Sequence, residues 1–159
     1  MMRRLACFVV LGLACGVVAA QDSKPAHVLF TPAQAKWGAP PPVFEKGASF
    51  TVISGDPSKA GLYVVRLKMP AGYKIAPHWH PTDEHVTVVS GNFALGMGEK
   101  FDKAALKTLP AGGYALMPAD MRHYAMATTA TTVQVHGQGP FALTYVNAAD
   151  DPSKRASAK

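Results

Sequence analysis

From residue 49 onward the chain alternates short apolar runs of four to nine residues with clusters of glycine, proline and aspartate. Glycine and proline interrupt helices and favour tight turns, so this pattern indicates strands. Strands at a spacing of about 8–12 residues are typical of an antiparallel sandwich or barrel. Only residues 99–107 have room for a helical turn. The predicted strands are 49–53, 61–69, 74–80, 84–90, 92–98, 105–109, 113–117, 123–128, 131–136 and 141–147.

The length and the local composition divide the chain into a single folded domain with two flanking segments. A chain of 159 residues is long enough for one hydrophobic core and too short for two. Residues 21–48 are rich in proline, which predicts an extended or irregular segment along the outside of the domain. Residues 148–159 are rich in alanine, serine and lysine and are predicted to be a flexible tail. The expected barrel therefore spans residues 49–147.

The first twenty residues have the composition of a secretory leader. Arg3 and Arg4 precede an uncharged apolar stretch from Leu5 to Val18, and small residues follow at Ala19 and Ala20. These are the three parts of a signal peptide. The alternative is a membrane anchor, but the apolar run is shorter than the roughly 20 residues that a span needs. We expect residues 1–20 to be removed, which makes the protein periplasmic or secreted, with no membrane attachment afterwards.

Charge and cysteine content narrow the classes of function. The net charge of +6 falls to +4 without Arg3 and Arg4, and much of the remainder lies in the C-terminal tail. No basic stripe with interleaved aromatic residues is present, so nucleic acid is not an expected partner. Both cysteines, Cys7 and Cys15, lie in the leader. The mature chain therefore has neither a disulfide nor a cysteine nucleophile.

Four residues have the spacing of a metal site. His78 and His80 are two apart on a predicted strand, so their side chains point to the same face. The turn at 81–83 then returns the chain, and the carboxylate of Glu84 can face the two imidazoles. His123 follows a second proline-led turn at the start of another strand. Three imidazoles and a carboxylate suit one divalent first-row transition metal, namely Fe, Mn, Ni, Cu or Zn.

The same positions resemble the two sequence motifs of the cupin superfamily. The first motif is matched at every fixed position, by Gly72, His78, His80, Glu84 and Gly91. The second motif is matched by Gly112, Pro118 and the metal-ligating His123. Two positions depart from it: Asp120 replaces the usual glycine and Ala127 a frequent asparagine. Aspartate tolerates a left-handed turn better than most residues, so we expect the loop geometry to be kept. The resemblance implies an all-β, double-stranded β-helix (jelly-roll) barrel that holds the metal inside and commonly forms a homodimer.

Period-two alternation predicts which side chains face the barrel interior. If Glu84 points inward, Val86 and Val88 do too, and His85 points outward. The strand at 131–136 leaves two alternatives: an apolar inner face, or an inner face carrying Gln134 and His136. In the second case both line the substrate pocket, and His136 acts as a general acid or base. Tyr145 shares a face with core residues and can offer its hydroxyl to a ligand.

Two functions fit these features. The first is an oxygenase-type metalloenzyme acting on a small neutral or aromatic substrate, because similar cupins include dioxygenases. In this hypothesis Glu84 serves in turn as metal ligand and base. Arg66 and Arg122 are both predicted to point outward, which disfavours an anionic substrate. The second is a non-catalytic module that binds a small molecule or the metal itself.

Overall fold

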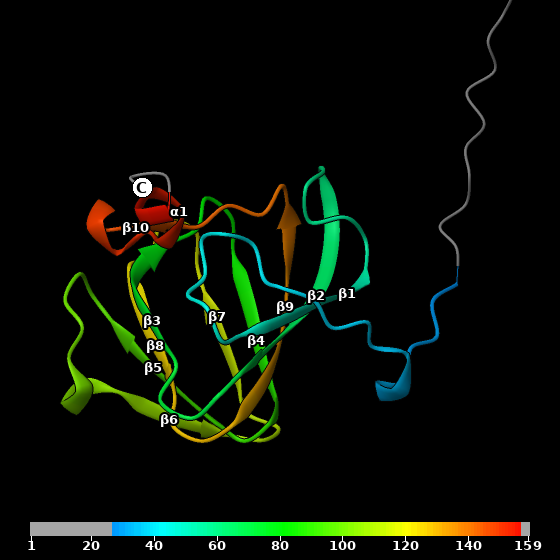
Figure 1. Ribbon diagram of the computed structural model, residues 1–159, viewed down its shortest axis with the longest axis horizontal. Coiled ribbons are helices and arrows are strands. Elements are labelled where there is room, and N and C mark those ends of the chain that lie inside the picture. The colour runs from blue at the N-terminus through cyan, green and yellow to red at the C-terminus, as the bar shows by residue number, and fades with distance from the viewer. Residues whose placement is uncertain (1–26, 157–159) are drawn as a thin grey trace, which may run out of the picture.

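The computed structural model describes residues 27–156, which form two five-stranded antiparallel sheets packed face to face (Figure 1). One sheet has the order β1-β2-β9-β4-β7 and the other β10-β3-β8-β5-β6. The first sheet consists of β1 (Ser49–Ser54), β2 (Gly61–Met69), β9 (Thr131–Gly139), β4 (Glu84–Ser90) and β7 (Tyr114–Met117). The second consists of β10 (Thr144–Tyr145), β3 (Lys74–Trp79), β8 (His123–Ala127), β5 (Asn92–Met97) and β6 (Lys107–Pro110).

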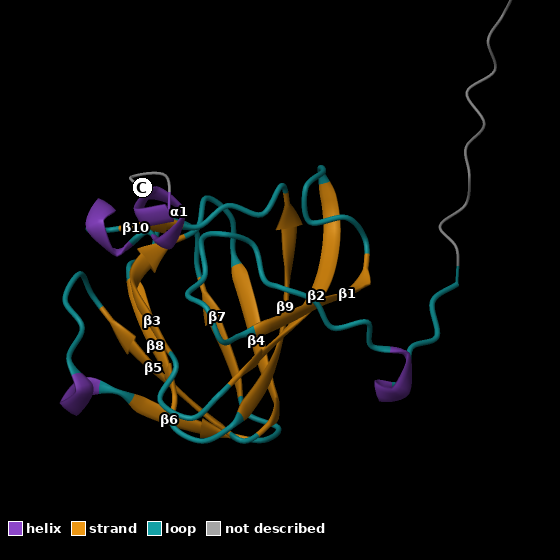
Figure 2. Ribbon diagram, in the orientation of Figure 1, coloured by secondary structure: helices purple, strands orange, loops and turns teal. Residues whose placement is uncertain are grey.

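This architecture confirms the predicted all-β jelly-roll fold. Each predicted strand coincides with one of the ten observed, most of them to within two residues at either end. The short 3₁₀ helix η2 (Lys103–Ala105) lies in the stretch where a helical turn was predicted. The largest differences concern the last two predicted strands: β9 continues to Gly139, and β10 is only two residues long. Helices are few and short, as Figure 2 shows.

The core lies between the sheets and is built by alternating side chains. On β2 the buried residues are Tyr63, Val65, Leu67 and Met69, while Arg66 between them is only half-buried and faces outward, as predicted. Val86 and Val88 of β4 are buried in the same layer. Burial of each aliphatic side chain contributes roughly 1.5–3 kcal/mol, so period-two alternation favours one register for strands such as β2 and β4.

Both flanking segments contact the barrel. The N-terminal segment includes η1 (Pro32–Gln34), and its Phe44 ring stacks on Phe141 with centroids 6.2 Å apart. The C-terminal segment, where a flexible tail was predicted, forms η3 (Ala148–Asp150) and α1 (Pro152–Ala156). The guanidinium of Arg155 in α1 pairs with the Glu45 carboxylate. The predicted signal peptide, residues 1–20, lies outside the described residues. Among residues 27–156, no helix is long and apolar enough to span a bilayer.

Candidate metal centre

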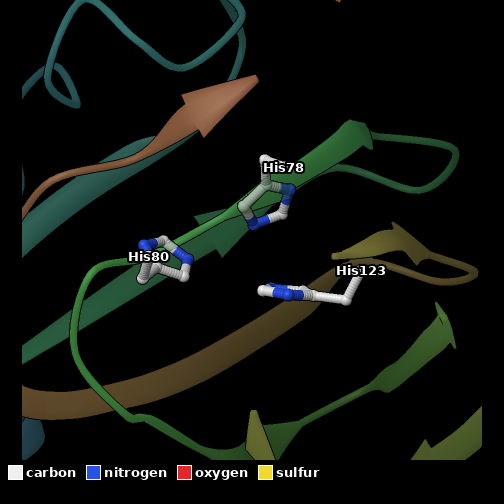
Figure 3. Close-up of side chains that lie close together, drawn as sticks. All are labelled: His78, His80 and His123. Carbon is white, nitrogen blue, oxygen red and sulfur yellow. The ribbon is translucent and has the colours of Figure 1, made fainter. Parts of the chain in front are cut away.

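Three buried histidines converge at one end of the barrel interior (Figure 3). His78 lies on β3 and is the cross-strand partner of His123, the first residue of β8. His80 follows immediately after the end of β3. Their exposed fractions are 3%, 5% and 1% for His78, His80 and His123. One ring nitrogen from each lies within 4.8 Å of the other two.

A bulge in β3 turns the side chains of His78 and His80 inward. Ile75 pairs with Ala125 and His78 pairs with His123, so three steps along β3 correspond to two along β8. Strict alternation from the inward-facing Ile75 would place His78 on the outer surface. The extra residue reverses this parity, and both Ile75 and His78 line the interior cavity. Without the bulge, the apolar half of β3 and its histidines could not share one face.

The turn before β8 is held to the turn after β3 by hydrogen bonds from two backbone amides. Asp120 has a φ of +63°, in the left-handed region, and its amide donates to the His80 carbonyl at 2.8 Å. The Ala119 amide donates to the Asp83 carboxylate at 2.8 Å. The aspartate thus adopts the conformation expected for the glycine it replaces. These bonds hold His80 beside the start of β8, where His123 begins the strand.

Backbone carbonyls set the tautomer of all three imidazoles. The Nδ1 atoms of His78, His80 and His123 lie 2.8, 2.7 and 2.9 Å from the carbonyl oxygens of Ala76, Ala142 and Met121. A carbonyl oxygen only accepts, so each Nδ1 carries the proton and each Nε2 offers a lone pair. The Nε2 atoms of His80 and His123 are buried and make no hydrogen bond to any residue that the structure describes. Fixed Nδ1 donors with unpaired, converging Nε2 atoms are the arrangement of metal-binding histidines, so the residues fit a metal ion.

Glu84, the first residue of β4, faces the same point. Its carboxylate oxygens lie 3.5 Å from His80 Nε2 and 3.4 Å from His123 Nε2. Burial by itself would raise the pKa of Glu84, but the nearby imidazoles outweigh it and lower the pKa to about 2. Burial, together with the neighbouring imidazoles, lowers the pKa of His78 to about 3. Near neutral pH the site therefore combines a carboxylate with a neutral His78, which is the protonation that a cation requires.

A cavity of about 40 Å³ adjoins these side chains. This volume exceeds the roughly 10–15 Å³ that one water molecule needs. The cavity reaches Glu84, His78 and His123 at one end, and its other walls are formed by apolar and aromatic side chains from both sheets. Among residues 27–156, no lysine or arginine lines it. The site therefore joins a polar, metal-compatible end to an apolar chamber.

The interpretation that placed Gln134 and His136 in the pocket is wrong. Val133 and Val135 of β9 are buried on the inner face and line the cavity, while Gln134 and His136 point outward. Gln134 accepts a hydrogen bond from Arg66 on the outer surface at 3.1 Å. The physical reason is the period of two: the buried valines face the core, so the polar residues between them cannot. His136 is therefore not positioned as a general acid or base for this cavity.

Two further predictions have mixed outcomes. His85 points outward as expected, stacks on His136 with centroids 4.6 Å apart, and has its Nδ1 2.6 Å from the Tyr114 hydroxyl. The ring of Tyr145 is buried beside His78, but its hydroxyl donates to the Val43 carbonyl at 2.7 Å. That hydroxyl is engaged by the N-terminal segment and does not face the cavity.

Tyr63 is a cavity residue that the sequence patterns did not single out. Its side chain, on β2, is 3% exposed and lines the cavity together with Glu84. The alternation of β2 correctly predicts an inward ring, but tyrosines on inner faces are usually core residues. The motif that contains Glu84 could have indicated a role for Tyr63 in the cavity, because Tyr63 lies on the same inner face of the sheet as that predicted ligand.

Comparison with known proteins places these features in a family. Residues 25–142 match the model of the ChrR cupin-like domain. A candidate acetylacetone dioxygenase from Methylibium petroleiphilum PM1 is similar in structure (TM-score 0.63, 20% identity, 87% of this chain and 98% of that one). So is the polyketide cyclase RemF from Streptomyces resistomycificus (TM-score 0.62, 14% identity, 85% and 93%). KdgF from Halomonas sp. is more distant in structure (TM-score 0.54, 21% identity, 69% and 92%).

At these identities the structural likeness establishes the fold alone. A comparison with curated proteins finds no significant match. The family model, however, covers well over half of the chain and includes all four predicted metal-binding residues. The chain therefore belongs to the ChrR cupin-like domain family, within the cupin superfamily.

Proposed function

We propose that this protein is an exported metalloenzyme of the oxygenase type, with one divalent first-row transition metal held by His78, His80, Glu84 and His123. The observation that carries the proposal is the pair of buried Nε2 atoms on His80 and His123 that have no hydrogen-bond partner. Leaving such atoms unpaired costs about 1–3 kcal/mol each, so their arrangement calls for a ligand that is a Lewis acid. The Glu84 carboxylate beside them supplies the compensating negative charge.

A metal bound there would supply Lewis-acid or oxygen-activating chemistry to a substrate in the cavity. The protein's own residues provide the rest. Glu84 lines the cavity, where its carboxylate is placed to accept a proton from a substrate hydroxyl or enol. The three Nδ1–carbonyl hydrogen bonds hold the imidazoles in orientation. Phe44 and Phe141 stack at the cavity wall and exclude water from the reacting groups.

The cavity favours a small uncharged substrate. Apart from the proposed metal, the described residues that line it include no lysine or arginine, so an anionic group placed away from the metal would lose hydration without gaining an ion pair. Aromatic rings from Phe44, Tyr63 and Phe141 contribute to its walls. Similarity in fold to a candidate acetylacetone dioxygenase and a polyketide cyclase is consistent with a small oxygenated organic molecule. Enols, β-diketones and phenols are the substrate classes to test first.

The test is metal analysis followed by oxygen uptake, on protein spanning residues 21–159 purified without chelators. We expect about one equivalent of a first-row metal in the wild type and a loss of that metal in a His78→Ala/His80→Ala double variant. His85→Ala is the matched control, because His85 adjoins Glu84 in sequence but lies on the outer face. Iron, manganese, nickel or copper should accompany oxygen consumption with a catechol, a flavonol or acetylacetone.

The outcomes separate the alternatives. Stoichiometric metal with reversible ligand binding, and no turnover of any tested substrate, would favour a non-catalytic binding module. Absence of metal after reconstitution would refute the proposed metal centre. Export is tested separately by fractionating cells that express the full chain and sequencing the mature N-terminus. A new N-terminus at residue 21 in the periplasm or medium supports the proposed signal peptide.

A further inference from the structure

Tyr63 is distinguished from every other tyrosine by its unpaired hydroxyl. The chain has five tyrosines, and all five lie within the described residues. The other four hydroxyls bond to the Glu45 carbonyl (Tyr73), His85 Nδ1 (Tyr114), the Asp102 carbonyl (Tyr124) and the Val43 carbonyl (Tyr145). Within residues 27–156 the Tyr63 hydroxyl has no hydrogen-bond partner. The Tyr63 side chain is largely buried, but its unpaired hydroxyl oxygen is not fully enclosed, so it can be reached by a ligand in the cavity.

The position of Tyr63 relative to the metal centre is set by three adjacent strands. Gly137 of β9 is the cross-strand partner of Tyr63 on β2 and of Glu84 on β4. Gly137 has no side chain, so the phenol occupies the space above it. A Cβ added to Gly137 would lie 3.1 Å from the Tyr63 hydroxyl oxygen and 2.9 Å from the Asp83 carbonyl oxygen. The missing side chain therefore opens a path for the hydroxyl toward Glu84.

The phenol is held firmly and keeps its proton. Its ring packs edge-on against Phe141, with centroids 6.1 Å apart and planes at 86°. Burial, with the nearby Glu84 carboxylate, raises the pKa of Tyr63 to about 12. At neutral pH the hydroxyl is thus a hydrogen-bond donor of fixed position at the cavity wall. Among the cavity-lining side chains, the other polar groups are His78, Glu84 and His123, all assigned to the metal centre.

We propose that the Tyr63 hydroxyl donates a hydrogen bond to an oxygen atom of the molecule bound at the metal centre. The ligand class is then a small uncharged compound with a carbonyl, enol or hydroxyl oxygen next to the oxygen that faces the metal. This inference rests on the proposed function and adds to it a residue that recognises the ligand. A purely apolar ligand would leave the hydroxyl unpaired and gain nothing from it.

The test uses acetohydroxamic acid, a small chelator with two adjacent oxygens that is uncharged at neutral pH. Its affinity is measured by isothermal titration calorimetry on metal-loaded wild type, Tyr63→Phe and Tyr73→Phe. Tyr73 is the matched control, because its buried hydroxyl bonds to the Glu45 carbonyl and it does not line the cavity. Metal content is determined on each sample before titration.

We expect equal metal content in all of these proteins. The dissociation constant of acetohydroxamic acid should rise about threefold to tenfold in Tyr63→Phe, because one hydrogen bond is lost. Tyr73→Phe should match the wild type. Equal affinity in wild type and Tyr63→Phe, with full metal, would overturn the role of Tyr63 and leave the proposed metal centre standing. Full metal without any binding of the probe to wild type would overturn the ligand class. Absence of metal from wild type would refute the proposed function, and this inference with it.

Discussion

Replacing His78 with phenylalanine separates the packing role of this buried side chain from its role as a metal ligand. The phenylalanine ring keeps the aromatic contact with His123, whose ring centroid lies 4.2 Å from that of His78. The pKa of His78 is lowered to about 3 by burial, so at pH 7 one neutral ring replaces another. The slightly larger ring can extend into the adjoining cavity of about 40 Å³. The loss is the hydrogen bond from Nδ1 to the Ala76 carbonyl, worth about 1 kcal/mol.

The expected stability change therefore depends on the metal. In the presence of a chelator, the free energy of unfolding of His78→Phe should lie within about 1 kcal/mol of the wild-type value, because only that hydrogen bond is lost. With free metal at 100 times its dissociation constant, the wild type should gain about 2.7 kcal/mol. A variant whose affinity is 100-fold weaker gains only about 0.4 kcal/mol at the same concentration. The difference between the two proteins should thus exceed about 2 kcal/mol only when metal is present.

The assay is urea unfolding followed by tryptophan fluorescence at pH 7, with EDTA and with added metal. His85→Phe is the control, because His85 lies outside the barrel, and it should keep the full metal-dependent gain. Equal stabilisation of wild type and His78→Phe by metal would refute the assignment of His78 as a ligand. A loss of more than about 3 kcal/mol in EDTA would show that the imidazole stabilises the core itself.

Three further predictions concern the turns and the buried tyrosines. In urea unfolding, Gly91→Ala should lower the free energy of unfolding by about 2–4 kcal/mol and Gly112→Ala by only about 1 kcal/mol. Both glycines have a positive φ, but of the two only Gly91 would place a Cβ in overlap with a neighbouring backbone carbonyl. Similar losses in the two variants would contradict this. Asp120→Gly should keep both the metal content and the stability to within about 1 kcal/mol, because glycine favours the same φ of +63°; loss of metal would show that the aspartate side chain is needed. The pKa of Tyr63 and of Tyr73 is raised to about 12, chiefly by burial, so both bind protons more tightly in the folded state. Their contribution to stability should be complete below pH 10 and lost as the pH rises towards 12, and absorbance at 295 nm should show fewer tyrosinates at pH 11 in folded than in urea-unfolded protein; equal absorbance would refute this.

Much of the fold was predictable because strand patterns and turn residues are local features. Alternation along residues 61–69 and 84–90 follows from the period of a strand, and burial of one face makes that register strongly preferred. The four residues of the candidate metal site were also predictable, since His78 and His80 precede a turn that Glu84 closes and His123 follows a second turn. The left-handed conformation of Asp120 follows from the tolerance of aspartate for that region.

The features of the site that strand alternation could not predict depend on contacts between segments distant in the sequence. Whether Val133 or Gln134 faces the core depends on how β9 pairs with β2 and β4, and a shift of one residue would exchange the two faces. The engagement of the Tyr145 hydroxyl by the Val43 carbonyl joins atoms 102 residues apart, which no local pattern encodes.

The sequence by itself determined the strands, the turns and the residue types able to bind a metal, because each follows from local periodicity and side-chain chemistry. Only the tertiary structure decided how these residues act together. The bulge in β3 brings His78 to the inner face beside Ile75, and Gly137 leaves space for the Tyr63 hydroxyl next to Glu84. Both features arise from pairing between strands, where one extra residue or one absent side chain changes what a neighbouring strand can place in the cavity.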